Sequence, residues 1–220
     1  MPLTYFPHQG HLWFLGNIFV YVILLLPLCY YLKNFNNDKF KKRLSILMSH
    51  PGGPFIISLF FIVEVVLVKP QLFALYAETW HGFFNGFLAF LFGFLLVYSG
   101  KNFWNTVSKW RWLYTGLAIV LFGVRFFYFG TEAPGYLMTI ESNSWFFAVF
   151  GFGYRYLNKP SKALSYLRQA VYPVYIIHMV VLYAGAKLIL PLKITDKLED
   201  VEISAFAVVV CFILYEFALR

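Results

Sequence analysis

Apolar residues occur along this chain in long runs separated by short polar segments. Residues 12–32 contain no charged side chain, and a helix of that length spans roughly 30 Å, about the thickness of a bilayer's hydrocarbon core. Seven runs are predicted to be membrane-spanning helices, namely 12–32, 54–69, 82–100, 112–130, 143–157, 171–191 and 202–219. The second and fifth are short and each carries a charge. The pattern predicts an all-α, polytopic transmembrane bundle of about seven helices.

The composition supports a membrane protein and excludes several other classes. Of the 220 residues, 60% are hydrophobic and only 13% are charged, whereas a soluble domain has about 25% charged residues. We therefore predict one integral membrane domain over residues 1–220 with no soluble appendage. The net charge of +8 could indicate nucleic-acid binding. We reject that class, because the basic residues lie in short loops between apolar runs.

The basic residues alternate between the loops. They are concentrated in the segments 33–53, 101–111 and 155–168. The alternate segments are poorer in basic residues, since Lys69 is the one lysine or arginine in 1–11, 69–81 and 131–142. In the fourth, 192–201, Lys193 and Lys197 are balanced by three acidic residues. Because cytoplasmic loops are enriched in Lys and Arg, this alternation predicts an N-terminus outside the cell membrane and a cytoplasmic C-terminus.

Three ionisable residues inside apolar runs are candidates for chemistry, since such residues are costly in lipid and usually face a bundle interior. Glu64 and Arg125 each lie about 7–8 Å below the same outer boundary. We predict that they pair and line an outward-open pocket; the alternative is that each reaches the surface separately. His178 lies near mid-membrane with Tyr175 on the same helix face. A structural hydrogen bond is the alternative to a functional role for His178.

A second group of polar residues maps to the outer boundary, and its members are His8, His11, His81, Glu78, Glu132 and Glu141. Histidine together with a carboxylate at a water–lipid boundary suits general-base work on a hydroxyl, or the orientation of an acceptor. The alternative is that they are ordinary interfacial polar residues. We expect no metal site, because the sequence contains no H-x-x-x-H, C-x-x-C or H-E-x-x-H spacing.

Two stretches carry a family resemblance, and a third supports it. His11-Leu12-Trp13-Phe14-Leu15 resembles the HLWFL element of the acyltransferase 3 family of membrane O-acyltransferases, most of all its glucan-succinylating branch. The segment 171–178, which includes Pro173, Tyr175 and His178, resembles the late P-x-Y-x-x-H of that family. The segment 79–94 and the basic turn containing Trp104 are similar to the family less specifically.

The resemblance implies a fold of about ten membrane helices and a reaction. Family members are thought to move an acyl group from a cytoplasmic acyl-CoA-type donor to a carbohydrate hydroxyl at the outer face. The implied partners are the lipid bilayer and a carbohydrate acceptor, with no bound cofactor. On this reading His11 and His178 are catalytic, and the substrate-binding residues are Glu64, Arg125, His81 and Tyr175.

The chain also departs from the family pattern. No residue matches the family's early helix, with its arginine-containing start and a histidine regarded as catalytic. We therefore expect the C-terminal two-thirds of a domain, as a fragment or split form in a bacterial inner membrane, with a second polypeptide supplying the missing helices. Two alternatives remain: a non-catalytic seven-helix binding or transport protein, and an inactive remnant.

Overall fold

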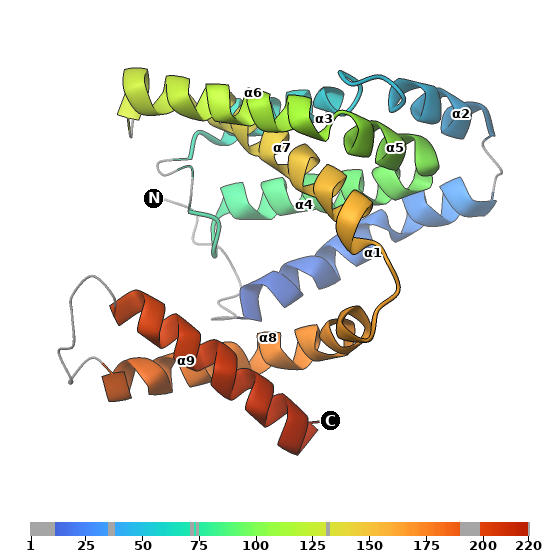
Figure 1. The fold of residues 1–220 in the computed structure, drawn as a ribbon. Helices are drawn as coiled ribbons and strands as arrows, with labels where there is room; N and C mark the ends of the chain where they lie inside the picture. The colour runs from blue at the N-terminus through green and yellow to red at the C-terminus, as the bar shows by residue number, and fades with distance from the viewer. Residues whose placement is uncertain are drawn as a thin grey trace. The chain divides into compact units, whose positions relative to one another are not determined.

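The computed structural model describes residues 12–34, 38–70, 73, 75–130, 133–189 and 199–219. Within these ranges the chain forms helices and short connections, with no strand. The predicted all-α fold is therefore confirmed (Figure 1). The helices are α1 (Trp13–Asn34), α2 (Asp38–Leu47), α3 (Phe55–Val68), α4 (Trp80–Tyr98), α5 (Lys101–Lys109), α6 (Arg111–Val124), α7 (Gly135–Phe152), α8 (Lys162–Ile189) and α9 (Glu199–Leu214). Three of them continue as π-helical turns, η2 (Arg125–Phe129), η4 (Gly153–Leu157) and η6 (Tyr215–Leu219).

Each of the seven predicted apolar runs lies largely within a helix, but the helices differ in length and polarity. Within the described residues, four are long and apolar enough to cross a membrane: α1, α4, α8, and α6 together with η2. Helix α3 is apolar but has only 14 residues. Helix α7 buries polar side chains such as Asn143 and Ser144. Seven crossings therefore stay a prediction, while a membrane protein is supported.

Two amphipathic helices occupy segments that were predicted to be loops. Helices α2 and α5 fall within the basic segments 33–53 and 101–111. In α5, Phe103 and Val107 are completely buried, four positions apart and so on one face of the helix. Short helices of this kind bury one apolar face and expose the other to water or headgroups.

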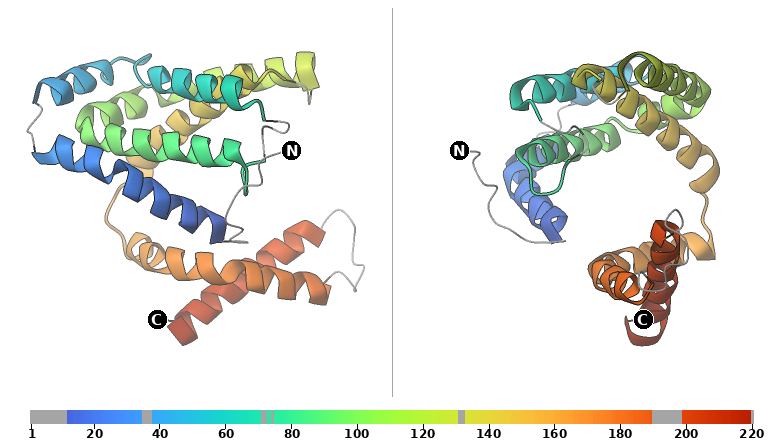
Figure 2. Two further views of the ribbon diagram at one scale, coloured as in Figure 1. Left: turned by 180° about the vertical axis from the view of Figure 1, so that it is seen from behind. Right: turned by 90° about the vertical axis from the view of Figure 1, so that its left-hand side faces the viewer.

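The chain divides into two compact units, residues 1–158 (unit 1) and 159–220 (unit 2). Unit 1 has a core of large apolar side chains contributed by α2 to α7, and its buried members are Met48, Ile57, Leu96, Phe103, Val107, Tyr114, Phe147 and Ala148. Helix α1 lies beside α4 (Figure 2), where the hydroxyl of Tyr21 donates a hydrogen bond to the carbonyl of Phe83 at 2.8 Å. The single domain predicted for residues 1–220 stays a prediction.

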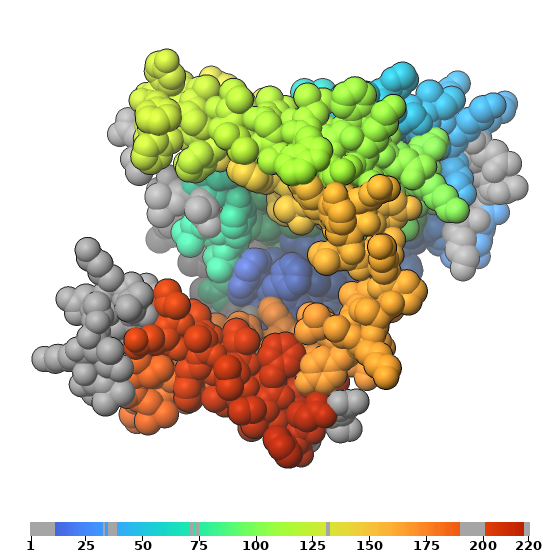
Figure 3. Space-filling view, in the orientation of Figure 1, coloured from blue at the N-terminus to red at the C-terminus, as the bar shows by residue number. Residues whose placement is uncertain are grey.

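Helix α6 covers one face of unit 1 (Figure 3). Its outward side chains are large and apolar, including Trp112, Ile119 and Val120, which are 56–65% exposed. Contiguous apolar surface of this kind is unusual on soluble monomers. It is the expected covering of a helix that faces lipid.

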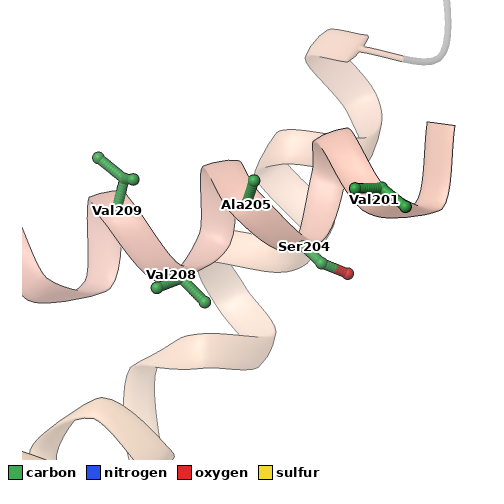
Figure 4. A pocket seen from close by; sticks show the side chains of 5 residues that line it. All are labelled: Val201, Ser204, Ala205, Val208 and Val209. Carbon is green, nitrogen blue, oxygen red and sulfur yellow. The ribbon is translucent and has the colours of Figure 1, made fainter. Parts of the chain in front are cut away.

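Unit 2 is formed by α8 and α9, which pack through Val181, Ala207 and Cys211. An open hollow of about 590 Å³ follows one face of α9 (Figure 4). Its lining repeats at helical spacing from Val201 to Val209, and Ser204 is its one polar member. This surface suits contact with lipid or another helix and offers no chemistry.

Helices α4 and α6 run in opposite directions, so the start of α4 and the end of α6 lie toward the same end of unit 1 (Figure 1). The two ends of unit 1 differ in their chemistry. The acid–base end is the part that contains Glu64, His81, Arg125 and Glu141. The basic end is the part that contains Lys109, Arg111 and Arg155.

Candidate functional site

The centre of the acid–base end is a buried pair between α3 and α4. The Nδ1 atom of His81 lies 2.9 Å and 3.0 Å from the two carboxylate oxygens of Glu64. The two side chains are only 2% and 4% exposed. Since an ionised carboxylate only accepts hydrogen bonds, Nδ1 carries the hydrogen and donates it. We call this pair the Glu64–His81 dyad.

The second ring nitrogen of His81, Nε2, is buried and has no hydrogen-bond partner among the described residues. With Nδ1 fixed as the donor, the neutral imidazole presents Nε2 as an acceptor. A carboxylate that orients a histidine in this way also stabilises the imidazolium formed when Nε2 takes up a proton. The dyad can therefore act as a general base.

The local sequence places His81 through a helix cap. The side chain of Thr79 accepts a hydrogen bond from the backbone of Gly82 at 3.0 Å and so caps α4. At Gly82 the preceding loop comes very close, because an added Cβ would lie 1.8 Å from the carbonyl oxygen of Tyr76. This approach lets the ring of Tyr76 stack on His81 with centroids 5.2 Å apart.

The ring of Tyr76 covers the dyad, and its phenol is neutral. Burial, and secondly the nearby Glu64 carboxylate, raises the pKa of the Tyr76 phenol above its ordinary value. The phenol is therefore protonated at physiological pH. The ring of Phe73 lies 5.6 Å from that of His81 and adds to the cover.

Arg125 has a different partner from the one predicted. Its Nε and Nη2 atoms donate to the two carboxylate oxygens of Glu141, at 2.6 Å and 3.0 Å. The predicted Glu64–Arg125 pairing is therefore wrong, because each residue is held by a group on a neighbouring helix. The helices that carry the two pairs nevertheless contact one another, because α3 packs against α4 and α7, and α6 packs against α7.

The two pairs are connected by a close helix contact. Val65 follows Glu64 on α3 and packs against Gly135 at the start of α7. A Cβ added to Gly135 would lie 2.3 Å from the Cγ1 atom of Val65. Glu141 lies further along the same helix and is 6% exposed. The placement of Glu141 at the outer boundary stays a prediction, and its bidentate partner Arg125 was not predicted.

The candidate residues of unit 2 form their own local arrangement. The Nδ1 atom of His178 lies 2.5 Å from the carbonyl oxygen of Tyr175. A carbonyl only accepts, so Nδ1 is the donor and Nε2 is left as an acceptor. Because Pro173 has no backbone N–H, it interrupts the hydrogen-bond ladder of α8 close to this contact. The arrangement fits the predicted structural role of His178 and leaves a functional role for it as a prediction.

His8, His11 and Glu132 lie outside the described residues. Within the part of the chain that is described, no three histidine, cysteine or acidic side chains come together as a candidate metal site.

Comparison with known families identifies the class of protein. Residues 1–216 match the acyltransferase domain family Acyl_transf_3, and the chain therefore belongs to this acyltransferase family. The match covers both units and confirms the family named from the sequence motifs. Neither the curated proteins nor the solved structures include a significant match to this chain.

Proposed function

We propose that this protein is a membrane O-acyltransferase that moves an acyl group from a cytoplasmic acyl-CoA-type donor to a carbohydrate hydroxyl at the outer face. The observation that carries the proposal is the family match over residues 1–216. The Glu64–His81 dyad supports it, because acyl transfer to a hydroxyl needs a base. We also propose that the protein lies in a bacterial inner membrane with its N-terminus on the outer side, and that the acceptor is a glucan.

The chemistry at the dyad follows from its hydrogen bonds. Nε2 of His81 takes the proton of the acceptor hydroxyl while the hydroxyl oxygen attacks the thioester carbon. A carbon–oxygen bond forms, the carbon–sulfur bond breaks, and the thiolate leaves and receives the proton from Nε2. Glu64 holds Nδ1–H throughout and stabilises the imidazolium between these two proton transfers.

The other candidates act around this step. Arg125, held in place by Glu141, shapes the same end of unit 1 without offering a free charge. His11, His178 and Tyr175 remain proposed contributors to acyl or acceptor positioning. A second polypeptide that supplies further helices also stays a prediction.

The test uses the purified full chain in proteoliposomes, with succinyl-CoA and a glucan oligosaccharide as the first probes. We expect His81→Gln to lower turnover by about 10²–10⁴-fold, the usual contribution of a general base. Glu64→Gln retains an oxygen that can accept from Nδ1 but loses the charge, so its loss should be smaller. The matched control is His50→Gln, which replaces an exposed histidine.

Two outcomes would contradict the proposal. If a folded His81→Gln protein had the turnover of the wild type, the dyad would have no role in the reaction. Absence of transfer by the wild-type chain with every acyl donor and carbohydrate tried would favour the binding or transport alternative, or the inactive remnant.

A further inference from the structure

The basic end of unit 1 contains a concave pocket that the proposed reaction has not used. Its volume is about 540 Å³, within the range of small-ligand sites. The lining comes from α5, the start of α6 and the π-helical turn η4, and its members are Asn105, Ser108, Lys109, Arg111, Tyr154 and Arg155. We call it the basic pocket.

The charge of the basic pocket is not neutralised by the protein. Three of its lining residues are cations and none is acidic. No aspartate or glutamate occurs between residues 79 and 131 or between 142 and 195. Among the described residues, none of the three cations has an ion pair with a carboxylate. The positive-inside rule explains why cations lie at this end, but it does not require them to converge on one cavity.

Arg111 is held in a fixed position in the pocket. Its Nη1 donates to the carbonyl of Ser108 at 2.6 Å, and its guanidinium lies 5.8 Å and 5.7 Å from the ring centroids of Phe152 and Tyr156. Its Nε is buried and has no hydrogen-bond partner among the described residues. Its Nη2 lies 3.5 Å from the hydroxyl of Tyr156. A guanidinium ordered in this way suits a phosphate oxygen, because its planar fork matches phosphate geometry.

The remaining walls combine neutral donors with an aromatic ring. Asn105 and Ser108 offer an amide and a hydroxyl beside the cations. Tyr154 stacks on Trp104 with centroids 5.5 Å apart and planes 21° from parallel, which fixes this wall. Cations, neutral donors and a rigid ring together favour a ligand with several phosphate oxygens and an organic body, over a simple inorganic anion.

We propose that the basic pocket binds the phosphate groups of the acyl-CoA donor. This inference rests on the proposed function, which supplies a phosphate-bearing donor on the cytoplasmic side. The predicted topology places the basic end on that side. An anionic lipid headgroup offers the same phosphate chemistry, and the experiment separates the two sources.

The experiment measures the affinity of the full chain for CoA and for dephospho-CoA, in nanodiscs of neutral phosphatidylcholine. We expect Lys109→Gln and Arg155→Gln each to weaken CoA binding about tenfold, because each removes a charge-assisted hydrogen bond. Their preference for CoA over dephospho-CoA should also shrink. Lys101→Gln is the matched control, since it removes an exposed lysine from the start of the same helix. Arg111 is left intact because its stem packs against Gly151.

Unchanged CoA affinity in both variants would overturn the proposal. So would a loss confined to anionic lipid, with Lys109→Gln and Arg155→Gln lowering retention of phosphatidylglycerol and leaving CoA affinity intact. Failure of the proposed function is distinguishable from both outcomes. If the chain binds CoA through Lys109 and Arg155 but transfers no acyl group, the pocket proposal stands and the proposed function fails. If acyl transfer is unchanged in both variants, the proposed function stands and the pocket proposal fails.

Discussion

The two ends of unit 1 handle charge in opposite ways. At the acid–base end two carboxylates are paired: Glu64 with His81, and Glu141 with Arg125. At the basic end three cations surround one cavity without an acidic partner among the described residues. Matched buried groups keep their geometry but have little charge left to offer a ligand. Unmatched cations at a pocket attract anions. The difference agrees with the proposed proton transfer at one end and the proposed phosphate binding at the other.

The largest effect on stability is expected from removing one member of a matched pair. Arg125→Gln leaves the Glu141 carboxylate, whose side chain is 8% exposed, without its cation. We expect a loss of about 3 kcal/mol in the free energy of unfolding, measured in mixed micelles. The double variant Arg125→Gln/Glu141→Gln should recover part of that loss. Purely additive losses would show that the two charges do not interact, and would break the comparison at the acid–base end.

A smaller loss is expected from a steric change at the basic end. A Cβ on Gly151 would lie 2.3 Å from the carbonyl oxygen of Val107 and 2.8 Å from the Cβ of Arg111. Both contacts belong to packed helices, so Gly151→Ala should lower the unfolding free energy by about 2 kcal/mol. It should also disturb CoA affinity, because it shifts Arg111. A fully stable protein with unaltered CoA affinity would show that α5 and α7 do not meet as described.

The smallest effect on stability is expected at Gly82, where the clash falls on a loop. An added Cβ would meet the carbonyl oxygen of Tyr76 at 1.8 Å, and a loop moves aside more readily than a packed helix. Gly82→Ala should therefore cost about 1 kcal/mol while lowering turnover clearly, because Tyr76 covers His81. CoA affinity serves as the internal control and should not change. If turnover stayed at the wild-type level, the cover over the dyad would have no role in the reaction.

The sequence predicted the elements better than their partners. Runs of apolar residues long enough for lipid need no tertiary information, so the helices containing them were identified. Helical rise predicts a similar depth for Glu64 and Arg125 below one boundary, and that depth stays a prediction. Which helices face each other is not encoded in that spacing. The partners of these two residues, His81 and Glu141, were therefore missed.

The basic segments show a different kind of error. Their charges indicate topology, with attraction of the phosphates of a CoA-type donor as the alternative. Neither interpretation predicts the helices inside these segments. Phe103 and Val107 at positions four apart were a usable signal for α5, and both are fully buried. The pocket beside α5 could not have been predicted, since Arg155 reaches it from the far end of another helix.

Helix α4 begins beside the dyad and ends near the basic end, and it has 19 residues. Its two ends are thus about 27 Å apart. On the proposed function, a donor whose phosphates bind the basic pocket has to reach the dyad across this distance, so the length of its flexible arm would limit the transfer. A donor analogue with a shortened arm should bind the chain as tightly as the natural donor and yet support no acyl transfer.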